Sequence, residues 1–332
     1  MPVITHRKLF LIIAAVVIVG SFAIIGAFGI KFGIDFTGGS LTEVAYQAAP
    51  DKATVEAAVA ALQLGEGSVR QSIDDVGRTA YLIRTRDLND NERVALTDSV
   101  AALGDGGEIT RFTSIGPVIG QELKDKAVWA IGAVVAIIVI YVAYAFAGIG
   151  TPVRSWTYGL ITIFVLFHDI LVPTALMSLL GQFAGVEADV LFIMALLAVL
   201  GYSVNDTIVV FDRVRENLVQ NRTEHRRKVQ RPGELETEEV TYTLTRPYAE
   251  LVGEAVTQTL ARSINTSLTT AIALAALYFF GGSVTQTFAL ILLVGVLAGT
   301  YSSILIASPL VVAYAKWRGV NVDGFDATDK AR

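Results

Sequence analysis

The stretch VLFIMALLAVLGYSVNDTIVVF, which runs from Val190 to Phe211, is long and apolar but contains one acidic residue, Asp206. An apolar run of about 20 residues crosses the hydrocarbon core of a bilayer as a helix. An ionisable side chain inside such a helix costs about 2.5 to 3.5 kcal/mol on insertion scales, and it is usually retained for ion or proton handling. The stretch therefore predicts a membrane transporter.

The composition of the whole chain also indicates a membrane protein. Its 332 residues are 53% hydrophobic and 17% charged, with a mean hydropathy of +0.56, whereas about a quarter of the residues of a soluble domain are charged. The chain has no cysteine, which excludes a disulfide framework, a metal-thiolate site and a cysteine nucleophile. We expect no cofactor and no bound metal.

Six apolar runs predict membrane-spanning helices, so the expected fold is a polytopic α-helical membrane protein. The runs are Leu9 to Phe28, Ala127 to Ile149, Trp156 to Leu180, Val190 to Phe211, Ser263 to Phe280 and Thr287 to Ala315. The first run follows Arg7 and Lys8, as in a secretory signal peptide. Its apolar core is longer than that of a signal peptide, and Ala27 to Lys31 is a poor cleavage site, so we interpret it as a retained anchor.

The positions of lysine and arginine predict the orientation. If the spans alternate, the basic residues fall on one side: Arg7, Lys8, Arg154, the cluster from Arg213 to Arg262, Lys316 and Arg318. The short loops Gly181 to Asp189 and Gly281 to Gln286 contain no lysine or arginine. Because cytoplasmic loops are enriched in positive charge, we expect both termini in the cytoplasm and the segment 31–125 outside it.

The segment 31–125 is predicted to fold as a small α+β domain between the first two spans. Its elements are expected at Leu41 to Gln47 (strand), Asp51 to Leu62 (helix), Ser68 to Ile73 and Arg78 to Thr85 (strands), Asn89 to Leu103 (helix) and Glu108 to Ser114 (strand). The order βαββαβ is that of a ferredoxin-like sandwich. The two helices would cover one face of the sheet and leave the other face open for a partner.

Several motifs follow one another at defined positions relative to the spans. They are Gly33 to Gly39 (GIDFTGG, with Asp35 and Gly38), Ile115 to Leu123 (IGPVIGQEL, with Gly116 and Pro117), His168-Asp169, Gly201 to Arg213 (GYSVNDTIVVFDR, with Asp206 and Asp212) and Arg262 to Thr270 (RSINTSLTT). Their order resembles that of SecF proteins in the SecD/SecF family of the bacterial protein translocase. One span, an external domain and five further spans also resemble half of the twelve-span resistance-nodulation-division (RND) layout.

The resemblance implies a multi-pass protein of the bacterial cytoplasmic (inner) membrane that, with SecD, uses the proton motive force in late stages of protein translocation. It implies contacts with the SecYEG translocon, accessory membrane insertion factors and unfolded secretory polypeptides, and none with nucleic acid. By matching motif, Asp206 is the membrane carboxylate and Arg262 is its candidate counter-ion. Half of a pseudo-symmetric bundle also leaves an apolar face that a membrane partner, SecD by resemblance, would cover. Such a protein is not an enzyme.

The physical chemistry of Asp206 and Arg262 agrees with that implication. Asp206 lies about six residues, or roughly 9 Å, from the cytoplasmic end of its span, and Arg262 begins the next span on the same side. Burial favours the protonated acid, whereas a nearby guanidinium favours the carboxylate. Movement of one relative to the other would change proton occupancy, and each proton that crosses contributes about 2.3 kcal/mol per 100 mV. The alternative is that Asp206 is only a structural hydrogen-bonding group.

Other polar residues of the spans also have two interpretations. Polar side chains in membrane helices more often form hydrogen bonds between helices than line a path for water. The residues concerned are Asn205, Thr266, Ser267, Thr269 and Thr270.

His168 and Asp169 lie near the middle of the membrane, and adjacent residues on a helix point about 100° apart, so we expect at most one of them to face Asp206. His168 has a packing role or a proton-relay role.

Two groups of motif residues are interpreted as structural. Asp35, Gly38 and Gly39 favour a tight turn in which Asp35 accepts backbone hydrogen bonds. Arg213 and Arg215 are interpreted as anchors at the cytoplasmic membrane boundary, with Asp212 as their local partner.

Two rival functions remain open at this point. An intramembrane aspartyl protease would use Asp169 and Asp206 as a dyad, but such a dyad requires carboxylates about 3 Å apart. Asp169 lies roughly 20 Å from the cytoplasmic end of its span against roughly 9 Å for Asp206. An RND-type exporter of small molecules or lipids would normally carry both halves in one chain.

The expected organisation is a first helix in residues 1–30, the external domain in 31–125, helices 2 to 6 in 126–315 and a cytoplasmic tail in 316–332. A cytoplasmic loop occupies about 213–262. In this loop the basic stretch Arg222 to Arg231 precedes the acidic run Glu234 to Glu239. We interpret it as solvated and disordered, with phospholipid contact as the alternative.

Overall fold

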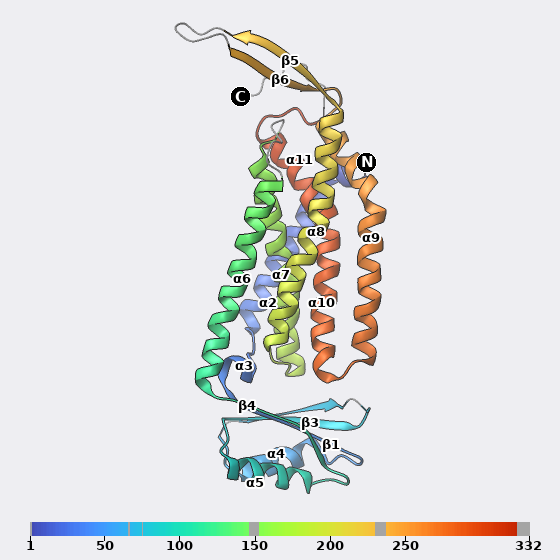
Figure 1. Cartoon of the computed structure of the whole chain (residues 1–332). Helices are drawn as coiled ribbons and strands as arrows, with labels where there is room; N and C mark the ends of the chain where they lie inside the picture. The colour runs from blue at the N-terminus through green and yellow to red at the C-terminus, as the bar shows by residue number, and fades with distance from the viewer. Residues whose placement is uncertain (1, 66, 75, 146–152, 230–236, 324–332) are drawn as a thin grey trace.

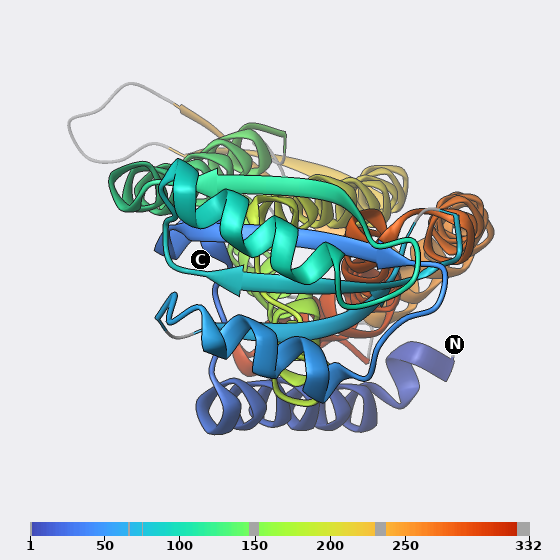
Figure 2. The ribbon, with the colours of Figure 1, turned by 90° about the horizontal axis from the view of Figure 1, so that it is seen from below.

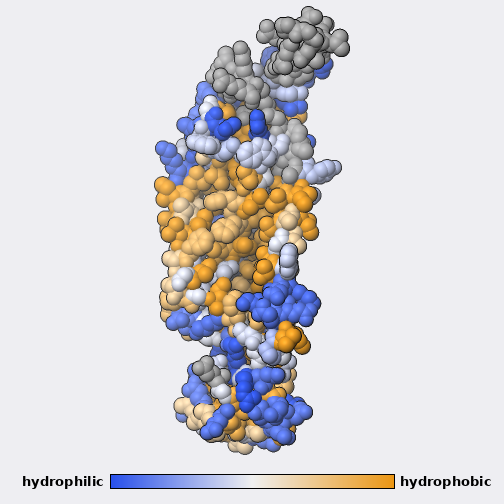
Figure 3. Space-filling view, turned by 90° about the vertical axis from the view of Figure 1, so that its left-hand side faces the viewer, coloured by the Kyte–Doolittle hydropathy of each residue, from blue (hydrophilic) through white to orange (hydrophobic). Residues whose placement is uncertain are grey.

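The computed structural model describes residues 2–65, 67–74, 76–145, 153–229 and 237–323. In this part of the chain, six helices are long and apolar enough to cross a membrane. They form a bundle with a small α/β domain at one end and a two-stranded hairpin at the other (Figure 1). Hydrophobic residues cover the middle of the bundle face in Figure 3, and hydrophilic residues gather at both ends.

The membrane helices contain the predicted spans and extend beyond several of them. They are α2 (Arg7–Phe28), α6 (Pro117–Ala145), α7 (Ser155–Ala184), α8 (Val190–Gln220), α9 (Tyr248–Phe280) and a composite of α10 (Ser283–Ser302), η1 (Ser303–Ala307) and α11 (Ser308–Trp317). The predicted end of the second span, 146–149, lies outside the described residues. The extensions are polar and helical, supported by pairs one turn apart such as Glu122 with Lys126 at 2.7 Å.

The sixth span is not one regular helix, because a π-helical turn interrupts it at Ser303–Ala307. Pro309 explains the interruption. Proline has no backbone N–H, so the carbonyl of the residue four positions earlier, Leu305, loses its α-helical donor. Such π turns occur frequently at functional sites.

The α/β domain lies between α2 and α6 in the sequence. Its elements are β1 (Gly39–Tyr46), α4 (Lys52–Ala61), β2 (Ser68–Ile73), β3 (Thr79–Thr85), α5 (Asp90–Ala101) and β4 (Glu108–Ile115). The strands pair antiparallel in the order β2-β3-β1-β4. The alternating patterns thus located these elements to within about two residues, whereas the short helices α1 (Pro2–Thr5) and α3 (Ile34–Thr37) had no such signal.

One face of the sheet is covered by α4 and α5, which lie away from the bundle (Figure 2). Val44, Tyr46 and Ile83 point to these helices and are buried with Leu96. The prediction that the other face is open was wrong. That face is turned toward the helix ends, and a cavity of about 380 Å³ between them is lined by Arg70 and Arg84, among others, from the sheet, and by the ends of α8 and α10 and the loop between α7 and α8.

The prediction of a disordered loop after α8 was also wrong. The chain forms a hairpin of β5 (Arg222–Val229) and β6 (Thr237–Leu244), and residues 230–236 lie outside the described part. The guanidinium of Arg222 lies 4.3 Å from the ring centre of Tyr242, and His225 bonds to Thr243 at 2.9 Å. Cross-strand pairs of this kind stabilise a two-stranded sheet. The prediction of disorder considered only the charge pattern along the sequence, which does not show such pairs.

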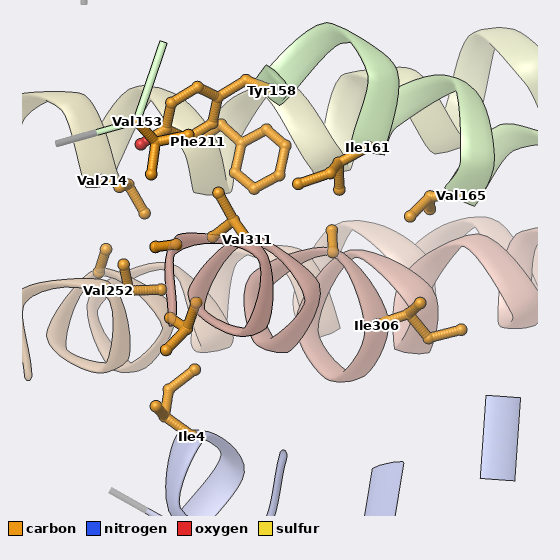
Figure 4. Packing of buried hydrophobic residues seen from close by; sticks show 14 of the residues in the cluster. Ile4, Val153, Tyr158, Ile161, Val165, Phe211, Val214, Val252, Ile306 and Val311 are labelled. Atoms are coloured by element: carbon orange, nitrogen blue, oxygen red, sulfur yellow. The ribbon is translucent and has the colours of Figure 1, made fainter. Parts of the chain in front are cut away.

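A hydrophobic cluster joins the helices near the hairpin end of the bundle (Figure 4). Tyr158 of α7 meets Phe211 of α8 edge-to-face, with ring centres 5.1 Å apart. Val252 of α9 and Val311 of α11 fill the same cluster and are buried. The Tyr158 hydroxyl is satisfied by the hydroxyl of Tyr248 at 2.8 Å. The cluster therefore fixes α7, α8, α9 and α11 relative to one another.

Two glycines bring α10 close to α8. A Cβ atom added at Gly295 would overlap the side chain of Val199, and one added at Gly299 would lie 3.0 Å from the Cβ of Ser203. Small residues four positions apart allow close approach of membrane helices. This approach sets the polar groups of α10 beside those of α7 and α8.

We expect Gly295→Ala to destabilise the fold by about 1 to 3 kcal/mol, because overpacking forces α10 away from α8. Gly201→Ala is the matched control, since that glycine is also helical but has open space around its Cβ position. Alanine in a helix is favoured over glycine by up to about 1 kcal/mol. Thermal unfolding in detergent should show a lower transition temperature for Gly295→Ala alone. Equal transitions for both variants would contradict the packing account.

Candidate functional site

The polar side chains of the membrane bundle gather where α7, α8 and the α10–η1 junction meet. Asp169 of α7 is fully buried, and Asp206 of α8 is 3% exposed. Ser203 lies one turn before Asp206 on α8, and the same close approach of α10 brings Ser302 into the cluster. The two carboxylates therefore share one polar region, but their surroundings differ.

Asp169 is saturated with hydrogen bonds. Its carboxylate accepts from the hydroxyl of Ser203 on α8 and from the hydroxyl of Ser302 on α10, the latter at 2.8 Å. The Nδ1 atom of His168 lies 2.8 Å from its other oxygen. Bonds to an ionised acceptor are the stronger kind. Asp169 thus joins three helices as a structural centre.

His168 completes this network. Its Nε2 atom lies 2.7 Å from the hydroxyl of Tyr301. If Nδ1 donates to Asp169, Nε2 accepts from the tyrosine, which satisfies both ring nitrogens of the neutral imidazole. His168 and Asp169 both face the bundle interior, since each is completely buried.

Asp206 is poorly satisfied by comparison. Within the described part of the chain, its one side-chain hydrogen bond comes from the hydroxyl of Ser267 on α9, at 3.5 Å. The same hydroxyl lies 2.8 Å from the carbonyl of Ser263, and it has one proton to donate. It accepts from Thr300 at 2.6 Å and from Tyr202 at 3.2 Å. A buried carboxylate with so little compensation gains much from taking up a proton.

Arg262 does not form an ion pair with Asp206 in this structure. No contact of 4.0 Å or less joins them among the described residues, and Arg262 is exposed. It nevertheless lies near enough to act electrostatically on Asp206. Asp169 also acts on Asp206 electrostatically, with no hydrogen bond between the two in the described chain. The arrangement is not that of an aspartyl-protease dyad, which shares a proton between touching carboxylates.

The remaining polar candidates divide by position. Ser267 belongs to the cluster, whereas Asn205 of α8 and Thr266 and Thr269 of α9 are exposed and Thr270 of α9 is half-buried. The three threonines bond to carbonyls of their own helix. The expectation that they join helices is therefore not met within this chain. The described residues contain no group of three or more side chains placed to hold a metal ion.

The motif residues between the first span and the domain pack as one unit. Gly38 and Gly39 have φ angles of 75° and 123°, which favour glycine. A Cβ atom at Gly38 would lie 2.8 Å from the Cα of Pro117, the first residue of α6. Gly116 accepts the amide of Gly120. Asp35 accepts from the amide of Val190, at 2.8 Å, so its backbone bond is to a distant helix and not to a local turn.

The prediction that Asp212 pairs with Arg213 at the C-terminal end of α8 was wrong. Arg213 pairs with Glu216 at 2.7 Å, and Asp212 is exposed. Residues three apart share a helix face, whereas neighbours in sequence do not.

Several members of the cluster were not among the residues predicted from the sequence. They are Tyr202, Ser203, Thr300, Tyr301 and Ser302. A signal for the α10 group was present, because Thr300 to Ser303 places four successive hydroxyl residues within an apolar span.

Family models match most of the chain. The model described as protein export membrane protein SecD/SecF, C-terminal, matches residues 95–233 and 234–317, and that of the SecD/SecF GG motif matches residues 23–50. A protein translocase subunit SecF of Thermobaculum terrenum is 35% identical over 94% of this chain and 93% of its own length. The corresponding protein of Pseudomonas aeruginosa is 35% identical over 86% of this chain and 81% of its own length. These are names of transport subunits, not of enzymes.

Longer relatives match as well. The protein translocase subunit SecDF of Thermus thermophilus is 33% identical over 89% of this chain, which spans 36% of that protein. A crystal structure of SecDF from Thermus, described as a translocon-associated membrane protein, superposes with a TM-score of 0.73 and 32% identity, covering 95% of this chain and 38% of the other. The apolar helices and these relatives make the chain a multi-pass inner-membrane protein. It belongs to the SecD/SecF family of protein export membrane proteins, among the SecF subunits.

Proposed function

We propose that the chain is a subunit of the bacterial protein export machinery that, with a SecD partner, uses the proton motive force to promote late stages of translocation, with Asp206 as the proton-carrying group. The observation that carries the proposal is the contrast between the two buried acids. Among the residues that the structure describes, Asp169 has three close partners, whereas Asp206 has one bond of 3.5 Å. Only the second carboxylate is free to exchange a proton without dismantling the bundle.

The relatives support the partner. In Thermus thermophilus the matching region is part of a longer SecDF protein, so the SecF part is joined there to the rest in one chain. A separate SecF chain would meet SecD through its own exposed helix surface. The polar residues Asn205, Thr266 and Thr269 are exposed and available to such a surface. The translocon-associated description of the solved SecDF supports contacts with the SecYEG translocon, and through it with unfolded secretory chains.

The architecture of the chain also supports the proposed membership of an RND-type export subunit. The strand order β2-β3-β1-β4, with α4 and α5 on one face, supports the proposal that the domain is a ferredoxin-like sandwich. We infer that this domain, residues 31–125, lies outside the cytoplasm, and that the six helices form half of an RND-type bundle. The hairpin and both termini then lie on the cytoplasmic side, where the basic residues are concentrated.

The mechanism follows from the position of Asp206. A proton entering the cluster would neutralise the buried carboxylate and remove its attraction to Arg262. A change in the balance of these charges would shift α8 relative to α9, while the Asp169 network holds α7, α8 and α10 together. Each proton that crosses supplies about 2.3 kcal/mol per 100 mV for such movement.

We expect Asp206→Asn to abolish the stimulation of secretion by a proton gradient, because the variant keeps the shape of the side chain but cannot release a proton. The measurement is protease-protected secretory protein in vesicles containing the complex with its SecD partner, with and without an imposed gradient. Assembly with the partner should be unchanged. Full stimulation in the Asn variant would exclude the carrier role.

Asp169→Asn should act on stability instead. The amide cannot replace the charge-assisted bonds from Ser203, Ser302 and His168, and each buried partner left unsatisfied costs about 1 to 3 kcal/mol. Thermal unfolding in detergent should show a marked loss for Asp169→Asn and a much smaller change for Asp206→Asn. The reverse order would contradict the division of roles between the two acids.

Single cysteines test the orientation in this cysteine-free chain. Ser68→Cys, in the α/β domain, should react with a membrane-impermeant thiol reagent added outside intact cells, and Thr223→Cys, in the hairpin, should react only after the membrane is opened. Both positions are exposed. Reaction of both from the same side would contradict the proposed topology.

A further inference from the structure

The α/β domain is joined to the bundle by two kinds of connection. The chain itself links the domain to α2 through the segment around α3, and to α6 through Gly116 and Pro117. The chain does not run directly from the domain to α8, the helix that contains Asp206, because α6 and α7 come between them. Whatever holds the domain to α8 must be non-covalent, and the structure shows a compact set of such contacts.

The first part of this joint is backbone pairing. The amide of Gly33 donates to the carbonyl of Ala188 at 2.8 Å, and the amide of Ala188 donates to the carbonyl of Lys31 at 2.7 Å. These bonds place Phe32 and Ala188 opposite each other in a single parallel bridge. Together with the bond from Val190 to Asp35, they attach the N-terminal end of α8 to the segment that enters the domain.

The second part is Arg84 of β3. Its guanidinium donates to Glu187 at 2.5 Å, to the carbonyl of Phe32 at 3.2 Å and to the hydroxyl of Thr37 at 2.7 Å. One planar group therefore binds the domain, the segment from α2 and the loop before α8. The Arg84 and Glu187 side chains are only 27% and 24% exposed, so solvent screens the pair less than a surface pair.

Arg70 of β2 lines the same cavity as Glu187 and Asp189 and acts on them by charge, but no hydrogen bond or ion pair joins it to them in the described part of the chain. The cavity lies between the sheet and the ends of α8 and α10, so the two surfaces are not packed continuously there. Asp189, two residues after Glu187, caps α8 and accepts from the amide of Phe192 at 2.9 Å. Among the described residues, the direct bonds that can pass movement of α8 to the domain are thus those of Arg84, Asp35 and the parallel bridge.

We propose that Arg84 is a positioning residue that ties the α/β domain to the N-terminal end of α8, so that the domain moves as one body with the helix that contains Asp206. The tie rests on the proposed function of Asp206, because it transmits the movement that proton exchange produces there. It also gives the glycine-rich segment after the first span a role, since Gly38 and Gly39 shape the chain that Arg84 and α8 hold from two sides.

The first test compares arginines of one domain in the vesicle secretion assay. Arg84→Ala should lose the gradient-dependent part of secretion, and Arg84→Lys should be intermediate because a point charge keeps one partner but not the planar fork. Arg86→Ala is the matched control. Arg86 pairs with Glu92 at 2.6 Å inside the domain and lowers the pKa of Glu92 to about 2, but it does not reach α8. Arg86→Ala should keep full stimulation.

The second test replaces the Arg84 contacts with a disulfide bond that can be formed and reduced. Phe32→Cys with Ala188→Cys places two thiols across the parallel bridge, where strand neighbours lie within the Cα separation that a disulfide requires. In the Arg84→Ala background, oxidation should restore stimulation and reduction should remove it again. In the otherwise unchanged chain, oxidation should leave stimulation intact.

The outcomes separate the joint from the carrier. If Asp206→Asn keeps stimulation in the same vesicles, the proposed carrier role fails, whatever Arg84 does. If Asp206→Asn loses stimulation, the joint is contradicted by full stimulation in Arg84→Ala, by a loss in Arg84→Ala that oxidation of the cysteine pair does not repair, or by a loss on oxidation of the otherwise unchanged chain. The last result would mean that the joint must open during the cycle.

Discussion

The cost of placing a carboxylate in a membrane is the constraint on which the bundle depends. The chain buries Asp169 and Asp206 in one region, and it provides them with unequal numbers of hydrogen bonds. Asp169 accepts from groups on its own helix, on α8 and on α10, which requires those helices to approach closely. Gly299 permits the approach at the level of Ser203, and the π turn after Ser302 lies directly beyond it. The hydrogen bonds of the buried acids therefore depend on the close packing of α7, α8 and α10.

Unequal compensation also explains how one bundle can be both stable and able to change. A fully bonded carboxylate is a poor proton carrier, because release or uptake would break several bonds at once. A buried carboxylate with one long bond has little to lose. The joint at the other end of α8 extends this division, since Arg84 and Asp35 hold the helix end firmly while the charge near its middle varies.

Much of this architecture was predictable from the sequence. Runs of apolar residues gave all six spans, and period-two and helical patterns gave the elements of the α/β domain, because both patterns are local. Asp206 was recognisable as an isolated charge in an apolar run. The partners of the buried acids were not, since Ser302 and Ser203 meet Asp169 only after three helices pack. The hairpin was missed for a similar reason, because its cross-strand contacts, such as Arg222 with Tyr242, are not visible along the chain.

The central claim is that Asp206, and not Asp169, exchanges a proton. Infrared difference spectroscopy of the reconstituted complex measures this directly, because a protonated carboxyl group has a C=O stretch that an ionised one lacks. We predict a carboxyl band that changes with pH, disappears in Asp206→Asn and persists in Ser302→Ala, which removes one donor to Asp169 and leaves Asp206 intact. A band that persists unchanged in Asp206→Asn would contradict the account.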